Sequence, residues 1–295
     1  PWNPPWEPDS GTPRGRFREI VPKLRSLRPA ASVCPWPDAR AGWLCRLSGA
    51  KVRAGFPMLP GNYHAMHIPW RAKNQRFGRL LELACPGGLY TLPLRRPDPL
   101  QHRIPDWEQA ARALGLGFDA TAPWWRVEPA VAADPARRVL ALAPHTRAAS
   151  KEWPEARFAD TANLLLRNGR IHEARALCPP GFEPRRELWP AGTVFVRTPG
   201  FGDLAAALLE CSALLANDSF PGHLAASLDV PTVTVFGSGS PDWFRPWGPK
   251  HTALLGGRCP HHPCIERCVM PEFYCLGELT PEDAARAVVE VLESR

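Results

Sequence analysis

Short apolar runs alternate with segments of helical periodicity through the second half of the sequence. In the segment 154–169, Phe158, Ala162 and Leu165 fall on one helical face, with a proline at the start and a glycine at the end. Strands that alternate with helices in this way predict a parallel, doubly wound sheet. We expect strands at 138–145, 174–181, 193–199, 212–218 and 231–237, and helices at 154–169, 203–213, 222–229 and 281–294.

The first half of the chain has a weaker pattern. Helical periodicity is present at 17–27, 40–50, 74–84 and 104–116, with short apolar segments between them. Proline crowds the first residues, where PWNPPWEP cannot form a regular element. We therefore expect a Pro-rich lead-in at 1–16, a partial N-terminal domain at 17–123, a linker at 124–137 and a C-terminal domain at 138–295.

The composition indicates a globular protein with an anionic partner. The 36 lysines and arginines outnumber the 29 aspartates and glutamates, which gives a net charge of +7. The cations are scattered and do not alternate with aromatic residues, so we expect no nucleic-acid partner. No apolar run is long enough to cross a membrane, and no signal-peptide pattern is present, so we expect a cytoplasmic location.

Two predicted turns offer polar side chains where a strand ends. The turn after 138–145 contains His145, Thr146, Arg147, Ser150 and Lys151, and cations with hydroxyls suit a diphosphate. The alternative is an ordinary solvated loop.

The second predicted turn contains Asp218, Ser219, Gly222 and His223. Taken singly, Ser219 could be an N-cap and His223 an ordinary helix residue. Since the carboxyl ends of parallel strands share one edge, we expect the two turns to converge on a ligand site.

The order of motifs in the second half resembles the C-terminal domain of glycosyltransferase family 9, the heptosyltransferases. The motifs are TRAASKEWP at 146–154, NDSFPGHLAA at 217–226, VPTVTVFG at 230–237, PDWFRPWG at 241–248 and TPED at 280–283, and 40–56 is a weaker echo of the N-terminal domain. The resemblance implies an α/β protein with the GT-B fold, in which two Rossmann-like domains carry parallel sheets and the N-terminal domain is incomplete.

The resemblance also implies a reaction, in which a sugar moves from a nucleotide-diphosphate donor, ADP-heptose, to a lipopolysaccharide-core or similar glycan acceptor. Lys151 would stabilise the leaving phosphate without a metal or other cofactor. A basic chain that acts on a glycolipid could be a peripheral contact at the inner face of the inner membrane, through the cations Arg71, Lys73, Arg76 and Arg79. The alternative for these cations is a solvated helix face. The donor-binding residues would be Thr146, Arg147, Ser150, Lys151, Asp218, Ser219, Gly222 and His223.

Two departures from the family pattern keep a second hypothesis open. Phe220 stands where the family has a glycine, and its ring would either obstruct the donor or stack on it. The family begins with an apolar strand and a Gly-Asp turn, but no such strand precedes Arg40, so we name no general base. The alternative function is a catalytically degenerate GT-B subunit that acts as a binding or structural partner.

Four of the nine cysteines cluster near the end of the chain. Their thiols could form a tetrahedral structural zinc or iron site, although paired C-x-x-C spacings are absent. The alternative is free or partly paired thiols. The residues are Cys259, Cys264, Cys268 and Cys275.

Overall fold

The chain forms two compact units, Pro1–Ala120 and Thr121–Arg295, in a computed structural model. The structure describes residues 16–35, 39–57, 87–96, 101–120, 134, 136–257, 259–264, 268 and 270–294. The predicted lead-in at 1–16 and linker at 124–137 fall largely outside these residues, so their bounds stay predictions. Among the described residues, no helix is long and apolar enough to cross a membrane.

The first unit contains a small parallel sheet whose strands lie in the order β1-β2-β3. The helices predicted at 17–27, 40–50 and 104–116 are confirmed, and the one at 74–84 lies outside the described residues. The strands are β1 (Ala31–Cys34), β2 (Val52–Gly55) and β3 (Leu92–Pro93), and the helices are α1 (Arg16–Ser26), α2 (Ala39–Leu47), η2 (Gly87–Leu89) and α4 (Ile104–Ala113).

The strand β1 corrects one expectation, because a strand does precede Arg40. It has only four residues, one of them serine, so its apolar run is too short to stand out in the sequence. It follows the helix α1, and the residues after it in the sequence read Pro-Trp-Pro-Asp rather than Gly-Asp. The missing aspartate of the first strand therefore remains unassigned.

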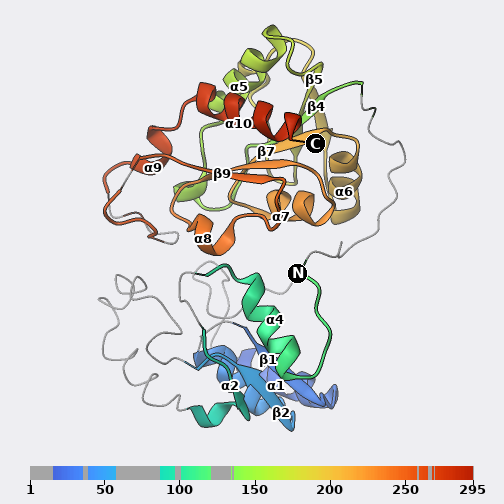
Figure 1. The fold of residues 1–295 in the computed structure, drawn as a ribbon, viewed down its shortest axis with the longest axis vertical. Coiled ribbons are helices and arrows are strands. Elements are labelled where there is room, and N and C mark those ends of the chain that lie inside the picture. Colours follow the sequence, from blue (N-terminus) through green and yellow to red (C-terminus); the bar gives the residue numbers. More distant parts are fainter. Residues whose placement is uncertain are drawn as a thin grey trace. The chain divides into compact units, whose positions relative to one another are not determined.

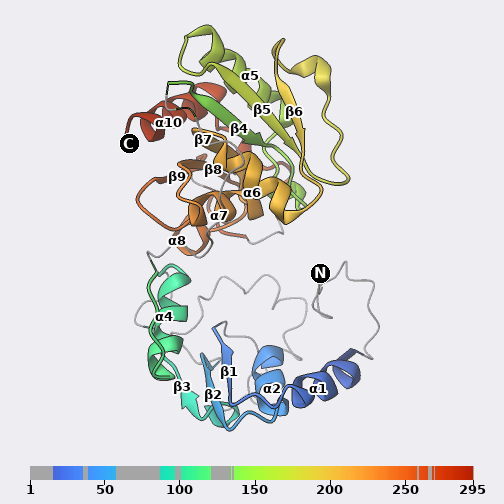
Figure 2. The same cartoon turned by 90° about the vertical axis from the view of Figure 1, so that its right-hand side faces the viewer.

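The second unit is a six-stranded parallel sheet with helices on both faces (Figures 1 and 2). The strand order β6-β5-β4-β7-β8-β9 confirms a doubly wound sheet. The strands are β4 (Val139–Ala143), β5 (Glu173–Cys178), β6 (Val194–Arg197), β7 (Ala213–Asn217), β8 (Thr232–Phe236) and β9 (His251–Leu255). The helices are η3 (Ala149–Lys151), α5 (Glu155–Arg167), η4 (Arg186–Leu188), α6 (Phe201–Leu209), α7 (Phe220–Ser227), α8 (Pro241–Phe244), α9 (Tyr274–Gly277) and α10 (Pro281–Glu293).

The central strands are buried on both faces, and their alternate residues contact different helices. In β4, Leu140 and Leu142 join the apolar cluster beneath α5 and α10, whereas Val139 and Ala141 join the cluster beneath α6 and α7. Side chains of a strand point alternately to the two faces of a sheet. Continuous apolar runs are therefore what this doubly covered sheet requires.

Three differences from the predicted elements have local causes. The helix α7 begins at Phe220, two residues earlier than expected, with Pro221 in its first turn where proline is tolerated. The helix α6 also starts early, at Phe201, because the Asp203 carboxylate accepts a hydrogen bond from the Gly200 amide. The strand β9 was missed because its sequence, HTALL, opens with two polar residues.

The buried Asn217 side chain holds the ends of two neighbouring strands together. At the end of β7, its Oδ1 accepts a hydrogen bond from the Trp153 amide at 3.0 Å. Its Nδ2 donates to the Pro144 carbonyl oxygen, which follows β4, at 2.5 Å. One side chain therefore fixes both ends of the segment from Pro144 to Trp153.

Replacing this amide is expected to destabilise the second unit. Asn217→Ala leaves a buried N–H and a buried C=O without partners and should lower the free energy of unfolding by about 2–4 kcal/mol. Asn163→Ala, at an exposed position of α5, should change it by less than about 0.5 kcal/mol. Urea unfolding of both variants would measure the difference, and equal midpoints would contradict the bridging role.

A histidine that favours its neutral form lies at the start of β9, which is the outermost strand on one side of the sheet. His251 begins β9 beside the Lys250–Asp229 ion pair, whose Nζ and Oδ2 atoms lie 2.6 Å apart. Burial lowers the pKa of His251 to about 4; Asp229 raises this pKa by a smaller amount, and Lys250 and His223 lower it further. The unfolded chain therefore takes up a proton on this ring at a higher pH than the folded chain does.

Stability is accordingly expected to fall in mild acid. The pKa of His251 in the folded chain lies below the ordinary value of 6.5. The contribution of this residue to the free energy of unfolding is therefore complete above pH 6.5 and is lost as the pH falls toward 4. The loss should be about 1–3 kcal/mol. Urea unfolding at pH 4.5 and 7 should show a smaller pH dependence in His251→Gln than in His261→Gln, an exposed control. Equal slopes would contradict this assignment.

Candidate functional site

The candidate site lies where β4, β7 and β8 end, because these three strands are adjacent and parallel. The segment 144–151 follows β4, Asp218 and Ser219 follow β7, and the segment 237–240 follows β8. The two turns predicted to converge therefore do so, and a third loop joins them. In open α/β sheets, ligands bind beyond the carboxyl ends of strands.

An ion pair between Lys151 and Asp218 connects the first two turns. The Lys151 Nζ lies 3.1 Å from the Asp218 Oδ2, and the two side chains are 19% and 5% exposed. Gly239 lies against the same carboxylate, because a Cβ added there would overlap Oδ2. The pair thus sits below the surface, with the ammonium as its more accessible end.

Ser150 ties the first turn to the loop after β8. Its hydroxyl lies 2.9 Å from that of Ser238, and its carbonyl oxygen accepts a hydrogen bond from the Ser238 amide at 3.0 Å. Gly237 permits this approach, since a Cβ there would overlap the Ser150 carbonyl oxygen. Ser150 therefore positions its neighbour Lys151. The predicted contact of Ser150 with the sugar donor stays a prediction.

The rest of the first turn is more open. Arg147 is exposed, and Thr146 is half-buried beside it. The His145 ring stacks on Phe182, with ring centroids 5.4 Å apart and planes inclined by 21°. The first turn therefore presents one exposed cation, Arg147, and one partly exposed cation, Lys151.

In the second turn, Ser219 and Gly222 serve local structure. The Ser219 hydroxyl donates to the Asn217 carbonyl oxygen at 3.2 Å and does not cap α7. Gly222 is buried, and a Cβ there would press on the Thr234 side chain of β8. Gly222 therefore allows α7 to lie close to the sheet, and its predicted role in donor binding remains a prediction.

His223 lies one turn along α7 and is exposed to solvent. Desolvation by the surrounding protein lowers its pKa, Asp218 raises it and Lys151 lowers it. These charge effects place His223 in the electrostatic field of the ion pair. A neutral imidazole can donate one hydrogen bond and accept another, which suits a polyhydroxylated ligand.

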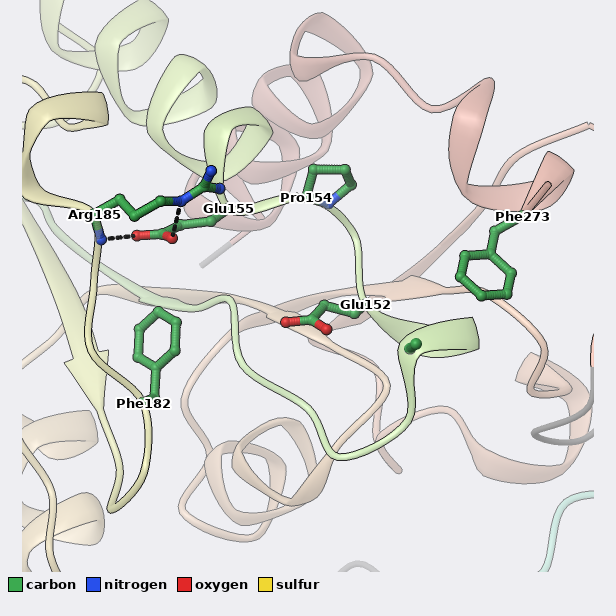
Figure 3. A pocket seen from close by; sticks show the side chains of 7 residues that line it. Glu152, Pro154, Glu155, Phe182, Arg185 and Phe273 are labelled. Carbon is green, nitrogen blue, oxygen red and sulfur yellow. Dashed lines mark hydrogen bonds and ion pairs between the residues drawn. The ribbon is translucent and has the colours of Figure 1, made fainter.

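A pocket of about 430 Å³ borders the first turn at Ala149. Figure 3 shows Glu152 between Phe182 and Phe273, and the ion pair of Arg185 with Glu155 at one side. The Glu155 carboxylate also accepts a hydrogen bond from the Trp189 indole at 2.8 Å. Sequence reasoning missed this pocket because the motif at 146–154 supplies only part of its lining, and the other residues come from segments far apart in the chain. The full lining is Ala149, Glu152, Pro154, Glu155, Phe182, Arg185 and Phe273.

The four clustered cysteines lie in a segment that touches the site. His262 in this segment has its Nε2 2.7 Å from the Gly239 carbonyl oxygen, which requires a proton on Nε2. Burial and the neighbouring thiols Cys268, Cys275 and Cys259 raise the pKa of Cys264 to about 11. Among the described residues, no group of three or more potential ligands is placed to hold a metal ion. The structural zinc or iron therefore remains a prediction.

The contact between Gly239 and Asp218 can be tested with a double-mutant cycle. Gly239→Ala should destabilise the unit by about 1–3 kcal/mol, because the new methyl group displaces the paired carboxylate. Asp218→Ala removes the obstructing atom, so Gly239→Ala should destabilise the Asp218→Ala protein much less than it destabilises the unaltered protein. Gly202→Ala, where a Cβ meets open space, is the matched control. Additive changes in urea unfolding would contradict the contact.

Comparisons with known proteins agree with this geometry. The model of glycosyltransferase family 9 (heptosyltransferase) matches residues 90–273. The chain is 30% identical to lipopolysaccharide heptosyltransferase 1 of Pseudomonas aeruginosa over 158 residues, which are 51% of this chain and 41% of that protein. It is 28% identical to lipopolysaccharide heptosyltransferase 2 of Salmonella typhimurium over 113 residues, which are 34% and 31% of the two chains. The chain thus spans less than half the length of these relatives.

Solved structures show the same fold. A glycosyltransferase family 9 protein from Veillonella parvula aligns with a TM-score of 0.65 at 17% identity, covering 95% of this chain and 78% of that one. The E. coli heptosyltransferase WaaC with ADP aligns with a TM-score of 0.61 at 16% identity, covering 94% and 78%. The expected GT-B fold with parallel sheets is therefore confirmed.

Proposed function

Because the chain belongs to glycosyltransferase family 9, we propose that it transfers a sugar from a nucleotide-diphosphate donor to a glycan acceptor. The observation that carries this proposal is the Lys151–Asp218 pair at the carboxyl edge of the sheet. The donor is ADP-heptose, and the acceptor is a lipopolysaccharide-core glycan or a similar glycan. The first curated relatives, which are named as lipopolysaccharide heptosyltransferases, support this choice of donor and acceptor.

The electrostatics of the two turns support a diphosphate site. The Lys151 ammonium has three N–H groups and one carboxylate, Asp218, as its ion-pair partner, so N–H groups remain to donate to phosphate oxygens. Arg147 adds an exposed cation, and the N-terminus of α7 carries a partial positive charge. The partner Asp218 holds the ammonium in place before the donor arrives, so little ordering is needed on binding.

The same groups would assist the reaction. The acceptor hydroxyl attacks the anomeric carbon, the bond from that carbon to the diphosphate breaks, and the electron pair leaves on the phosphate oxygen. Lys151 lowers the barrier because negative charge grows on this oxygen. The acceptor gives its proton to a general base that the described residues do not identify. No metal ion or other cofactor is assigned to this step.

A glycolipid acceptor would place the protein in the cytoplasm as a peripheral contact at the inner face of the inner membrane. The net charge of +7 favours an anionic lipid surface. The cations singled out in the sequence, Arg71, Lys73, Arg76 and Arg79, lie outside the described residues. The structural zinc or iron at the cysteine cluster is a separate proposal with no part in the reaction.

The alternative is a binding subunit that holds the nucleotide without turnover, and the unassigned general base favours it. Both functions require nucleotide binding at Lys151. Release of ADP from ADP-heptose in the presence of a lipopolysaccharide-core acceptor would support the enzyme, and binding without release would support the alternative.

Removing the Lys151 ammonium should weaken nucleotide binding. Lys151→Ala is expected to lower the ADP affinity about 10–100-fold in isothermal titration, because a charged hydrogen bond is lost and Asp218 is left to repel the phosphates. Adding Asp218→Asn should recover part of the loss. Lys250→Ala is the matched control. This lysine also pairs with an aspartate, but it lies at the amino-terminal end of β9, away from the carboxyl ends of the strands.

Unchanged ADP affinity in Lys151→Ala would contradict the proposed site. An equal loss in Lys250→Ala would show that the effect arises from net charge rather than from a specific contact.

A further inference from the structure

Two exposed phenyl rings stand beside the candidate site. Phe220 is 55% exposed and Phe201 is 41% exposed, although both occupy the first turn of helices that pack on one face of the sheet. Their ring centroids are 5.8 Å apart and their planes are inclined by 45°. Aromatic pairs at such distances attract one another, so Phe201 restricts the orientations open to Phe220.

Phe220 adjoins the predicted donor-binding residues on both sides. It is the first residue of α7 and follows Asp218 and Ser219 directly. His223 lies three positions further along the same helix, so the Phe220 and His223 side chains project from the same side. Both side chains are exposed, and the paired Asp218 carboxylate lies at the base of the turn.

This combination of groups fits a sugar ring better than a phosphate. A pyranose presents hydroxyl groups around its rim and C–H groups on a face. The exposed imidazole of His223 can bind hydroxyl groups, and a phenyl ring can cover an apolar face. A phosphate would gain nothing from the phenyl ring, which carries partial negative charge on its face. The cations Lys151 and Arg147 lie on the other turn, so the diphosphate and the sugar each meet suitable chemistry.

We propose that Phe220, supported by Phe201, is a specificity-determining residue that packs against the C–H face of the donor's sugar. This inference rests on the proposed function, because it assumes that a nucleotide-diphosphate sugar occupies the site. A glycine at position 220 would leave the space above Ser219 open and would exclude no sugar by shape. The phenyl ring instead favours donors whose sugar turns an apolar face toward α7.

The test compares the affinities for ADP and for ADP-heptose, since only the second ligand carries the sugar. Phe220→Gly should weaken ADP-heptose binding by about tenfold and change ADP binding by less than about twofold in isothermal titration. Phe220→Leu should lose less, because it keeps apolar contact without a flat ring. Phe201→Leu should show a smaller loss of the same kind. Val194→Ala, which trims an exposed apolar residue at the start of β6, should change neither affinity.

Each other result overturns a stated part of the inference. Equal or tighter ADP-heptose binding by Phe220→Gly would show that the ring is a bystander or an obstacle. A parallel loss of ADP affinity would place the ring against the nucleotide instead of the sugar. If the unaltered chain binds neither ligand, the proposed function fails, and this inference fails with it. Circular dichroism melting would confirm that each variant is folded.

Discussion

The candidate site depends on the two hydrogen bonds of the Asn217 side chain. This buried amide holds the Pro144 carbonyl at the start of the first turn and the Trp153 amide at its end. Between these points the chain makes the short 3₁₀ helix η3, whose last residue is Lys151. The position of the ammonium is therefore set by contacts to the sheet. The loop after β4 can carry a cation to a defined place because both of its ends are fixed.

Burying the Lys151–Asp218 pair costs desolvation free energy, but the pair also positions the ammonium group. Removing two charges from water is expensive, and the attraction between them does not reliably compensate for that expense. Here the ammonium stays 19% exposed, so its desolvation is incomplete. The aspartate holds the ammonium beside the end of β7, and it also offsets part of the positive charge. Such a pair would suit the proposed function, in which a diphosphate is bound and then released after transfer.

The repeating pattern of the second unit was readable in the sequence because the sheet is covered on both faces. Continuous apolar runs such as VLALA in β4 are distinctive, and every strand predicted there is present. The short strands of the first unit and β9 were missed, since four-residue or partly polar strands leave little periodicity to detect. Convergence of the two turns followed from the parallel sheet. The third loop, with Ser238 and Gly239, could not be predicted, because its contacts depend on the spatial order of β4, β7 and β8.

The glycines of the site explain why Phe220 is the residue that a ligand would meet. A glycine near a ligand site suggests close approach of the ligand to the backbone. In this protein, however, Gly237 makes room for the Ser150 carbonyl, Gly239 for the Asp218 carboxylate, and Gly222 for Thr234. These three positions are filled by the protein's own atoms. At the start of α7 it is the side chain of Phe220 that reaches solvent, so the shape of the opening is set there by a phenyl ring.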